Sequence, residues 1–240
     1  MPNHVLIIQN DPTENLGLYE EFLHEKAEVT LLKAYDMKLG EQFPPTKLFH
    51  AFIVGPTPIS ANDTQNHVFL RNELGYLQTI IESGKPVLGV CCGGQMLAKL
   101  QGAEVLRSPS KEIGCYTVAL TNHGKRDPLF RGFPNEFPVF QWHQDMFTVP
   151  PNGRLLATGT PCPIQAYAKG NVRGLIFHLE INSRAAENWI DAYPNELIGT
   201  GRSREEVIRE CRKRELEMRQ LAERLVENLL VLPAPQPFHR

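Results

Sequence analysis

The sequence has few of the features that would place a protein outside a reducing cell interior. Its 240 residues include five scattered cysteines, an odd number without the spacing of a disulfide framework or a zinc site. No apolar run approaches the roughly 20 residues of a membrane span. The opening "MPNHVLIIQNDP" lacks the basic lead and cleavage site of a secretory signal. We therefore expect a cytoplasmic protein.

The sequence also has no large excess of positive or negative charge. The formal net charge is −2, which gives no electrostatic reason to expect nucleic acid or an anionic membrane as a partner. A Gly-rich phosphate loop and an ATP-pyrophosphatase-like segment are missing as well, so the sequence predicts no nucleotide cofactor and no synthetase activity.

What the sequence does contain is an alternation of short apolar runs with amphipathic helical patterns. Strands buried on both faces that alternate with helices indicate a doubly wound, mostly parallel, flavodoxin-like α/β sheet. After residue 103, strand-like runs punctuated by Gly and Pro, the last of them "VRGLIFHLE" at 172–180, predict a small antiparallel extension with one or two returns to the main sheet. The predicted strands are 4–9, 28–33, 48–55 and 85–90, and the predicted helices are 14–25, 67–83 and 93–101.

The C-terminal part has a different pattern. Ser203 and Glu206 have capping-box spacing, and an apolar stripe follows to residue 232. The stripe is not a sustained heptad, so the pattern predicts a long helix that packs on its own domain rather than a coiled coil. We expect a main domain at 1–195 and a helical extension at 196–240.

Two adjacent cysteines lie where the fourth strand turns into a helix. Cys91 has the position of a nucleophile at a strand-to-helix elbow, where Gly89 and Gly93 let the tight turn close. The N-terminus of the following helix is expected to lower the pKa of the thiol. Cys92 should point away while its N–H faces an oxyanion formed at Cys91. The alternative is that both cysteines are small buried hydrophobes.

A second motif favours the nucleophile. His178 and Glu180 are separated by one residue on a predicted strand, so both side chains should share one face. The carboxylate could then orient the imidazole, and the imidazole could serve the thiol as base and acid. Alone, the pair would be an ordinary surface contact. Together with the elbow it predicts a Cys91-His178-Glu180 triad.

These motifs resemble the class I glutamine amidotransferases, most closely stand-alone members similar to the amidotransferase domain of GMP synthase. The elbow G-V-C-C-G-G-Q matches the family's G-[IV]-C-x-G-x-Q, H-L-E matches H-P-E, and "WHQD" resembles W-H-G-D. The resemblance implies a cysteine-thioester mechanism on a γ-glutamyl carbonyl, with backbone oxyanion donors at Gly55 and Cys92. It further implies substrate-binding roles for Gln95, Trp142, His143, Gln144 and Asp145.

Three positions depart from the family pattern. Gly55-Pro56-Thr57-Pro58 replaces Gly-Gly-Pro, and proline has no N–H to donate, so Gly55 or Thr57 must supply the second oxyanion donor. Gly94 replaces a larger residue and is expected to widen the pocket. Leu179 replaces proline and is expected to loosen the chain before Glu180.

The predicted function is hydrolysis of glutamine or a related γ-glutamyl compound, with release of ammonia or an amine. The released ammonia could pass to a separate synthase subunit. An intracellular cysteine peptidase and a catalytically weakened binding or regulatory module remain alternatives. His143 and Asp145 form an H-x-D pair, but two groups without a third are weak evidence of a metal site, so we expect no metal.

Overall fold

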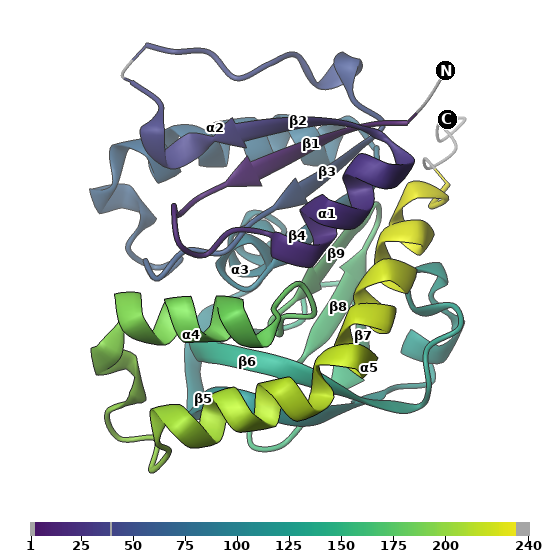
Figure 1. The fold of residues 1–240 in the computed structure, drawn as a ribbon. Helices are drawn as coiled ribbons and strands as arrows, with labels where there is room; N and C mark the ends of the chain where they lie inside the picture. The colour runs from purple at the N-terminus through teal and green to yellow at the C-terminus, as the bar shows by residue number, and fades with distance from the viewer. Residues whose placement is uncertain (1–2, 39, 234–240) are drawn as a thin grey trace.

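The computed structural model describes residues 3–38 and 40–233, and its described strands form one nine-stranded sheet in the order β2-β1-β3-β4-β9-β8-β7-β5-β6 (Figure 1). The strands are β1 (His4–Gln9), β2 (Glu28–Lys33), β3 (Ala51–Val54), β4 (Val87–Val90), β5 (Val105–Leu120), β6 (Glu136–Phe147), β7 (Arg154–Thr158), β8 (Ala166–Lys169) and β9 (Val172–Leu175). The α-helices are α1 (Gly17–Lys26), α2 (Val68–Glu82), α3 (Cys92–Leu100), α4 (Ser183–Ala192) and α5 (Arg204–Leu230).

The sheet has a parallel and an antiparallel half. Strands β2, β1, β3, β4 and β9 pair in parallel, whereas β8, β7, β5 and β6 add antiparallel ladders. This arrangement confirms the predicted α/β fold with its antiparallel extension. The runs predicted at the start of the extension belong to one strand, β5, whose pairing with β6 is irregular between Arg107 and Glu112.

Two hydrophobic cores lie on opposite faces of the sheet. On β1, Val5 and Ile7 join the core that contains α1, α4 and α5, whereas Leu6 and Ile8 join the core that contains α2 and α3. In Figure 1, α1 and α5 cross the near face of the sheet, and α2 and α3 lie behind it. The alternation along β1 is the period of two expected for a strand that is buried on both faces.

The long C-terminal helix begins at a capping box. Ser203 accepts a hydrogen bond from the Glu206 N–H, and the Glu206 side chain accepts one from the Ser203 N–H, as predicted. The apolar stripe of α5 joins the same core as α1, α4 and β5. The division at residue 195 remains a prediction.

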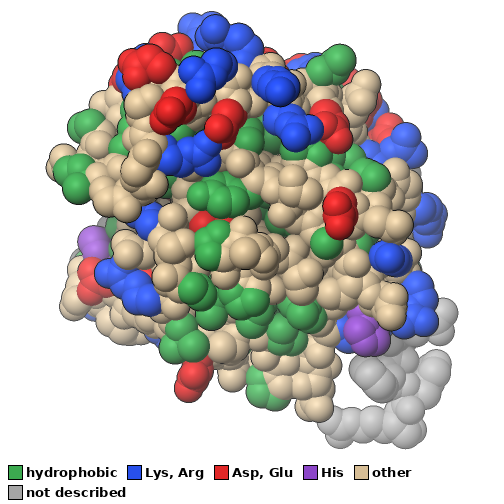
Figure 2. Space-filling model, turned by 90° about the horizontal axis from the view of Figure 1, so that it is seen from below, with side chains coloured by type: hydrophobic (Ala, Val, Ile, Leu, Met, Phe, Trp, Pro, Cys, Tyr) green, Lys and Arg blue, Asp and Glu red, His purple; other side chains and the backbone are tan. Residues whose placement is uncertain are grey.

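The surface seen from below in Figure 2 has acidic and basic side chains interspersed along its upper rim and a group of hydrophobic side chains near its centre. Among the described residues, no helix combines the length and apolar character needed to cross a membrane.

Candidate active site

The elbow after β4 holds Cys91 in an unusual backbone conformation. Its φ is 49° and its ψ is −114°, and its N–H donates to the Leu175 carbonyl at 2.8 Å. A Cβ at Gly93 would lie 2.2 Å from the Val54 carbonyl oxygen, and one at Gly89 would lie 2.7 Å from Gly94 Cα. The turn can therefore close only with glycine at Gly89 and Gly93.

The two cysteine side chains lie on different sides of the sheet. Cys91 belongs to the core that includes α1 and α4, and Cys92 belongs to the core that includes α2 and α3. Cys91 Sγ lies 3.9 Å from the Trp142 carbonyl, and Cys92 Sγ lies 3.3 Å from the Ile59 carbonyl. The backbone N–H of Cys92 acts to lower the pKa of the Cys91 thiol, which indicates that this amide lies near the reacting atom.

The thiol of Cys91 is not acidified in the resting protein. Burial raises the pKa of Cys91, the charge of Glu14 raises it further, and the Cys92 N–H only partly offsets them. The expected lowering of this pKa by the helix N-terminus is therefore wrong, because loss of hydration outweighs it. Cys91 is a neutral thiol until a base removes its proton.

His178 and Glu180 are in contact, although the strand that was predicted to carry them ends earlier than expected. β9 ends at Leu175, and His178 forms an isolated antiparallel bridge with Phe140 of β6. His178 Nδ1 lies 2.5 Å from Glu180 Oε1, and Glu180 Oε2 accepts the Leu179 N–H at 3.0 Å. A proline at position 179 could not make this second bond, so Leu179 fixes the carboxylate rather than loosening it.

The geometry of His178 leaves one nitrogen available. Its ring is fully buried and packs edge-on against Trp189, with ring centroids 5.0 Å apart. Nε2 has no hydrogen-bond partner among the described residues. When Nδ1 donates to Glu180, Nε2 carries the lone pair that a general base needs.

Gly55 does not fit its predicted role as an oxyanion donor. Its N–H donates to the Ile8 carbonyl at 2.8 Å as part of the sheet, so it is already occupied. Pro56 follows and has no N–H. Thr57 is buried and lines the same pocket as Cys91, and within the described residues its N–H has no hydrogen-bond acceptor. Thr57 therefore replaces Gly55 as the candidate for the second oxyanion donor.

Gly94 does not widen the pocket as predicted. A Cβ there would lie 2.8 Å from the Leu175 carbonyl oxygen, so the position faces the backbone of β9. Tyr167 also donates to the Gly94 carbonyl at 3.3 Å. Glycine is required here because it lets α3 pack closely against the sheet.

A pocket of about 260 Å³ opens beside Cys91. All five residues predicted to bind substrate line it, although Gly55, His178 and Glu180 do not. Thr57, the alternative oxyanion donor, also lines it, and six further lining residues had no predicted role: Glu14, Pro58, Ile59, Ser60, Arg107 and Glu196. For Glu14 a signal was present, because it lies on the loop after a parallel strand, where ligands of doubly wound sheets bind.

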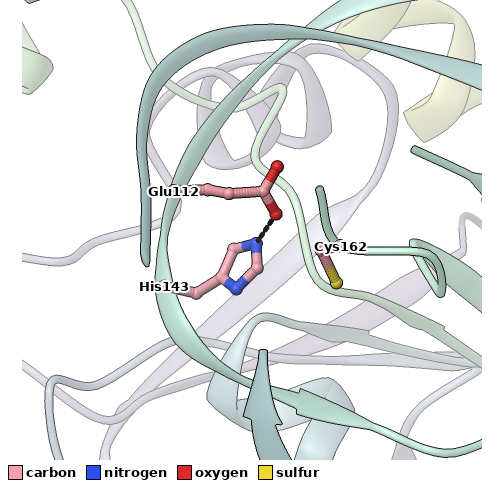
Figure 3. Close-up of side chains that lie close together, drawn as sticks. All are labelled: Glu112, His143 and Cys162. Atoms are coloured by element: carbon pink, nitrogen blue, oxygen red, sulfur yellow. Dashed lines mark ion pairs between the residues drawn. The ribbon is translucent and has the colours of Figure 1, made fainter. Parts of the chain in front are cut away.

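The H-x-D pair does not converge on a common point. Asp145 accepts a hydrogen bond from Ser60 at 2.7 Å and lies 3.5 Å from Arg107 Nε. The ring of His143 instead faces Glu112, with Nε2 and Oε2 3.1 Å apart (Figure 3). Its Nδ1 contacts the Asp145 carbonyl at 3.1 Å.

Cys162 completes a buried cluster with Glu112 and His143 (Figure 3). Their potential ligand atoms lie within 4.8 Å of one another. His143 Nδ1 contacts the Asp145 carbonyl, however, and Cys162 Sγ contacts the Ile164 carbonyl at 3.5 Å. The absence of a metal stays a prediction.

Comparison with known proteins agrees with this architecture. A family model described as glutamine amidotransferase class-I matches residues 9–191. The glutamine amidotransferase-like protein YfeJ of Salmonella typhimurium is 30% identical over 199 residues, which cover 80% of this chain and 82% of the relative. GMP synthase of Thermus thermophilus is 36% identical over 149 residues, but these cover 56% of this chain and only 28% of that enzyme.

Solved structures share the whole fold. A glutamine amidotransferase from Thermotoga maritima superimposes with a TM-score of 0.86 at 29% identity, covering 97% of this chain and all of that one. A glutamine amidotransferase from Methylobacillus flagellatus gives 0.84 at 25% identity, covering 100% and 99%. The family model spans most of the chain, and the relatives agree with it. The chain therefore belongs to the class-I glutamine amidotransferase family.

Proposed function

We propose that the protein is a cysteine amidohydrolase that cleaves the γ-carboxamide of glutamine, or the γ-amide of a related γ-glutamyl compound, through a γ-glutamyl thioester. The observation that carries this proposal is that one chain holds both an elbow cysteine open to a pocket and a buried imidazole in contact with a carboxylate. His178 Nδ1 lies 2.5 Å from Glu180 Oε1, and Cys91 opens into the pocket. Nucleophile, base and orienting group are the parts of a covalent acyl-transfer site.

In the first step, His178 Nε2 removes the proton from the neutral Cys91 thiol as the sulfur attacks the γ-carbonyl carbon. The raised pKa of Cys91 makes this base necessary, since little thiolate exists at rest. The oxyanion that forms is held by the N–H groups of Cys92 and Thr57. Two such donors, aimed at developing charge, lower the barrier more than they stabilise the substrate.

In the second step, the imidazolium gives its proton to the leaving nitrogen, and ammonia or an amine departs. His178 then takes a proton from water, which attacks the γ-glutamyl thioester and releases glutamate and the Cys91 thiol. Glu180 holds the tautomer of His178 throughout. Gln95 and the Trp142–Asp145 segment form the pocket wall that would receive the amino acid end of the substrate.

The fate of the ammonia depends on the partner. One relative is named GMP synthase [glutamine-hydrolyzing], and this chain spans only 28% of it. A separate synthase subunit that accepts ammonia therefore remains a proposal of the same rank as hydrolysis of free γ-glutamyl compounds by the chain alone.

A substrate screen tests the proposed chemistry. Purified protein is incubated with glutamine, γ-glutamyl amides and γ-glutamyl peptides, and intact-protein and peptide mass spectrometry follow adducts and released glutamate. We expect a γ-glutamyl adduct on Cys91 and none on Cys92. Release of glutamate by a Cys91→Ala variant at the wild-type rate, or an adduct on Cys92 alone, would refute the mechanism.

A further inference from the structure

The loop between β1 and α1 is held in one conformation by the second half of the chain. Asp11 Oδ1 accepts hydrogen bonds from the Thr13 and Glu14 N–H groups at 2.8 and 2.9 Å. Tyr193 donates to the same oxygen at 2.7 Å, and Trp189 Nε1 donates to the Thr13 carbonyl at 3.0 Å. Glu14 thus projects from a braced loop rather than from a free one.

The side chain of Glu14 is buried without a partner of its own. It is 2% exposed, it lines the pocket beside Cys91, and its Oε1 has no hydrogen-bond partner among the described residues. Burial raises the pKa of Glu14, and so do the charges of Asp11, Glu196 and Glu180. A carboxyl group taken out of water without a donor is costly, so something outside these contacts should meet it.

The other three acids near Glu14 already have partners. Glu180 contacts His178, Asp11 accepts from Tyr193, and Glu196 forms an ion pair with Lys111 at 2.6 Å. Of these four acids, Glu14 is the one that faces the pocket without a hydrogen-bond or ion-pair partner in the described part of the chain. Its surroundings are acidic, so the group that best fits beside it is a cation that can donate hydrogen bonds.

Glu14 and the nucleophile share one pocket, as the two ends of a γ-glutamyl group require. Both residues line it, and the charge of Glu14 is the second cause of the raised pKa of Cys91. In an extended γ-glutamyl group, four bonds of about 1.5 Å place the α-nitrogen ~5 Å from the carbonyl carbon. One pocket can therefore receive the α-ammonium at Glu14 and the carbonyl at the sulfur.

We propose that Glu14 forms the subsite for the α-ammonium group of the substrate, and that the enzyme selects γ-glutamyl compounds whose α-amino group is free. This inference rests on the proposed γ-glutamyl hydrolysis. An N-acylated glutamine brings no positive charge to Glu14. Glutamine residues within peptides, whose α-nitrogen is acylated, are rejected on the same ground.

Kinetics on a matched pair of substrates test the subsite. γ-Glutamyl-p-nitroanilide and its N-acetyl derivative differ only at the α-nitrogen. We expect wild type to favour the free amine in kcat/KM by roughly 10- to 100-fold, which is the range of one hydrogen bond to a charged group. Glu14→Gln should lose most of this preference through a higher KM for the free amine, with the N-acetyl substrate little changed. Glu14→Asp should keep part of it.

Glu73→Gln is the matched control. Glu73 is also a fully buried carboxyl, and it accepts a hydrogen bond from Asn10 at the start of the same loop, but it does not line the pocket. The preference ratio should survive in this variant. An equal loss of ratio in Glu73→Gln and Glu14→Gln would show a general effect of buried charge and overturn the assignment.

The outcomes separate the subsite from the underlying function. Hydrolysis of both substrates with equal kcat/KM by wild type would overturn the subsite while the γ-glutamyl chemistry stands. Failure to hydrolyse either substrate, together with no Cys91 adduct in the screen, would overturn the function itself. A fall in kcat of Glu14→Gln that is equal for both substrates would make Glu14 part of the acid–base machinery and would also refute the subsite.

Discussion

The parallel and antiparallel halves of the sheet contribute to the pocket in different ways. Parallel strands are short, and the groups to which we assign the chemistry lie on the loops that follow them: Thr57 after β3, Cys91 after β4 and His178 after β9. In the antiparallel half, Trp142–Asp145 lie within the body of β6. Loops after parallel strands can aim single groups at one point, whereas a continuous strand presents a wall. We therefore expect the reacting groups to come from the parallel half and much of substrate recognition to come from the antiparallel half.

A few polar contacts join the halves. Gln95 of α3 donates to the Asp145 carbonyl at 3.2 Å, Ser60 donates to the Asp145 carboxylate, and Phe140 pairs with His178 through two backbone hydrogen bonds. If this division is right, changes to the reacting groups Thr57, Cys91 and His178 should reduce kcat, and changes at the junction should mainly raise KM. The following predictions test it.

The largest effect is expected at the nucleophile. Cys91→Ser should lower kcat by more than about a thousandfold, because a serine at the same elbow lacks the nucleophilicity of sulfur and the members of a triad act as a unit. Cys92→Ala is the control, since it keeps the N–H and changes a side chain on the other face of the sheet. Glutamate release measured by a coupled assay checks both. A Cys92→Ala variant as inactive as Cys91→Ser would remove the distinction between the two cysteines.

His178→Ala should be nearly as damaging, and Glu180→Gln should be milder. The imidazole moves the proton, whereas the carboxylate fixes its orientation and tautomer through the 2.5 Å contact. Single-turnover measurement of thioester formation separates loss of attack from loss of hydrolysis. Unchanged turnover in His178→Ala would rule out the triad.

The third effect concerns the oxyanion donor. Thr57→Pro removes the N–H at this position and should reduce kcat by about a hundredfold, the usual effect of losing one donor. Thr57→Ala keeps the N–H and should retain most of the activity. Circular dichroism confirms folding of both variants. If the two variants lose activity equally, the Thr57 side chain rather than its amide is responsible.

A smaller effect is expected at the junction of the halves. Gln95→Ala loses the hydrogen bond to the Asp145 carbonyl and should raise KM roughly 3- to 10-fold with little change in kcat. Gln101→Ala, at the end of the same helix, loses a hydrogen bond to Lys169 that is remote from the pocket and should leave KM unchanged. A fall in kcat rather than a rise in KM would place Gln95 with the reacting groups.

The smallest effect lies outside both halves. Ser203→Ala removes the capping bond of α5 and should lower the free energy of unfolding by about 1 kcal/mol without altering kcat or KM. Ser203→Thr keeps the cap and should restore the thermal midpoint. A change in KM on uncapping would show that α5 supports the pocket directly.

Local patterns in the sequence predicted the parts of the structure that depend on neighbouring residues. The elbow at Cys91, the capping box and the alternation of strands and helices all follow from short spacings. The occupied N–H of Gly55 could not be predicted, because its acceptor is the Ile8 carbonyl on another strand. Gly94 likewise faces Leu175 of β9. The pairing of strands that are distant in the sequence determines the surroundings of both glycines.

The electrostatics of the site also depended on the tertiary structure. The helix N-terminus was a valid reason to expect a low pKa at Cys91, but burial and the carboxylate of Glu14 have the larger effect. Glu14 reaches the pocket only because Trp189 and Tyr193 of the C-terminal region brace its loop. Which residues of two distant segments come into contact cannot be predicted from the sequence of either segment alone.

The backbone of Cys91 has a consequence for how this sequence can change over generations. A φ of 49° is a conformation in which an ordinary side chain destabilises the fold by about 1–3 kcal/mol, and glycine does not. Selection for folding alone would therefore replace this cysteine with glycine, and only selection for turnover retains it. A gene copy released from its catalytic duty gains stability by the same substitution that ends its activity. Inactive descendants of this chain should thus be more heat-resistant than the enzyme, with glycine in place of the nucleophile.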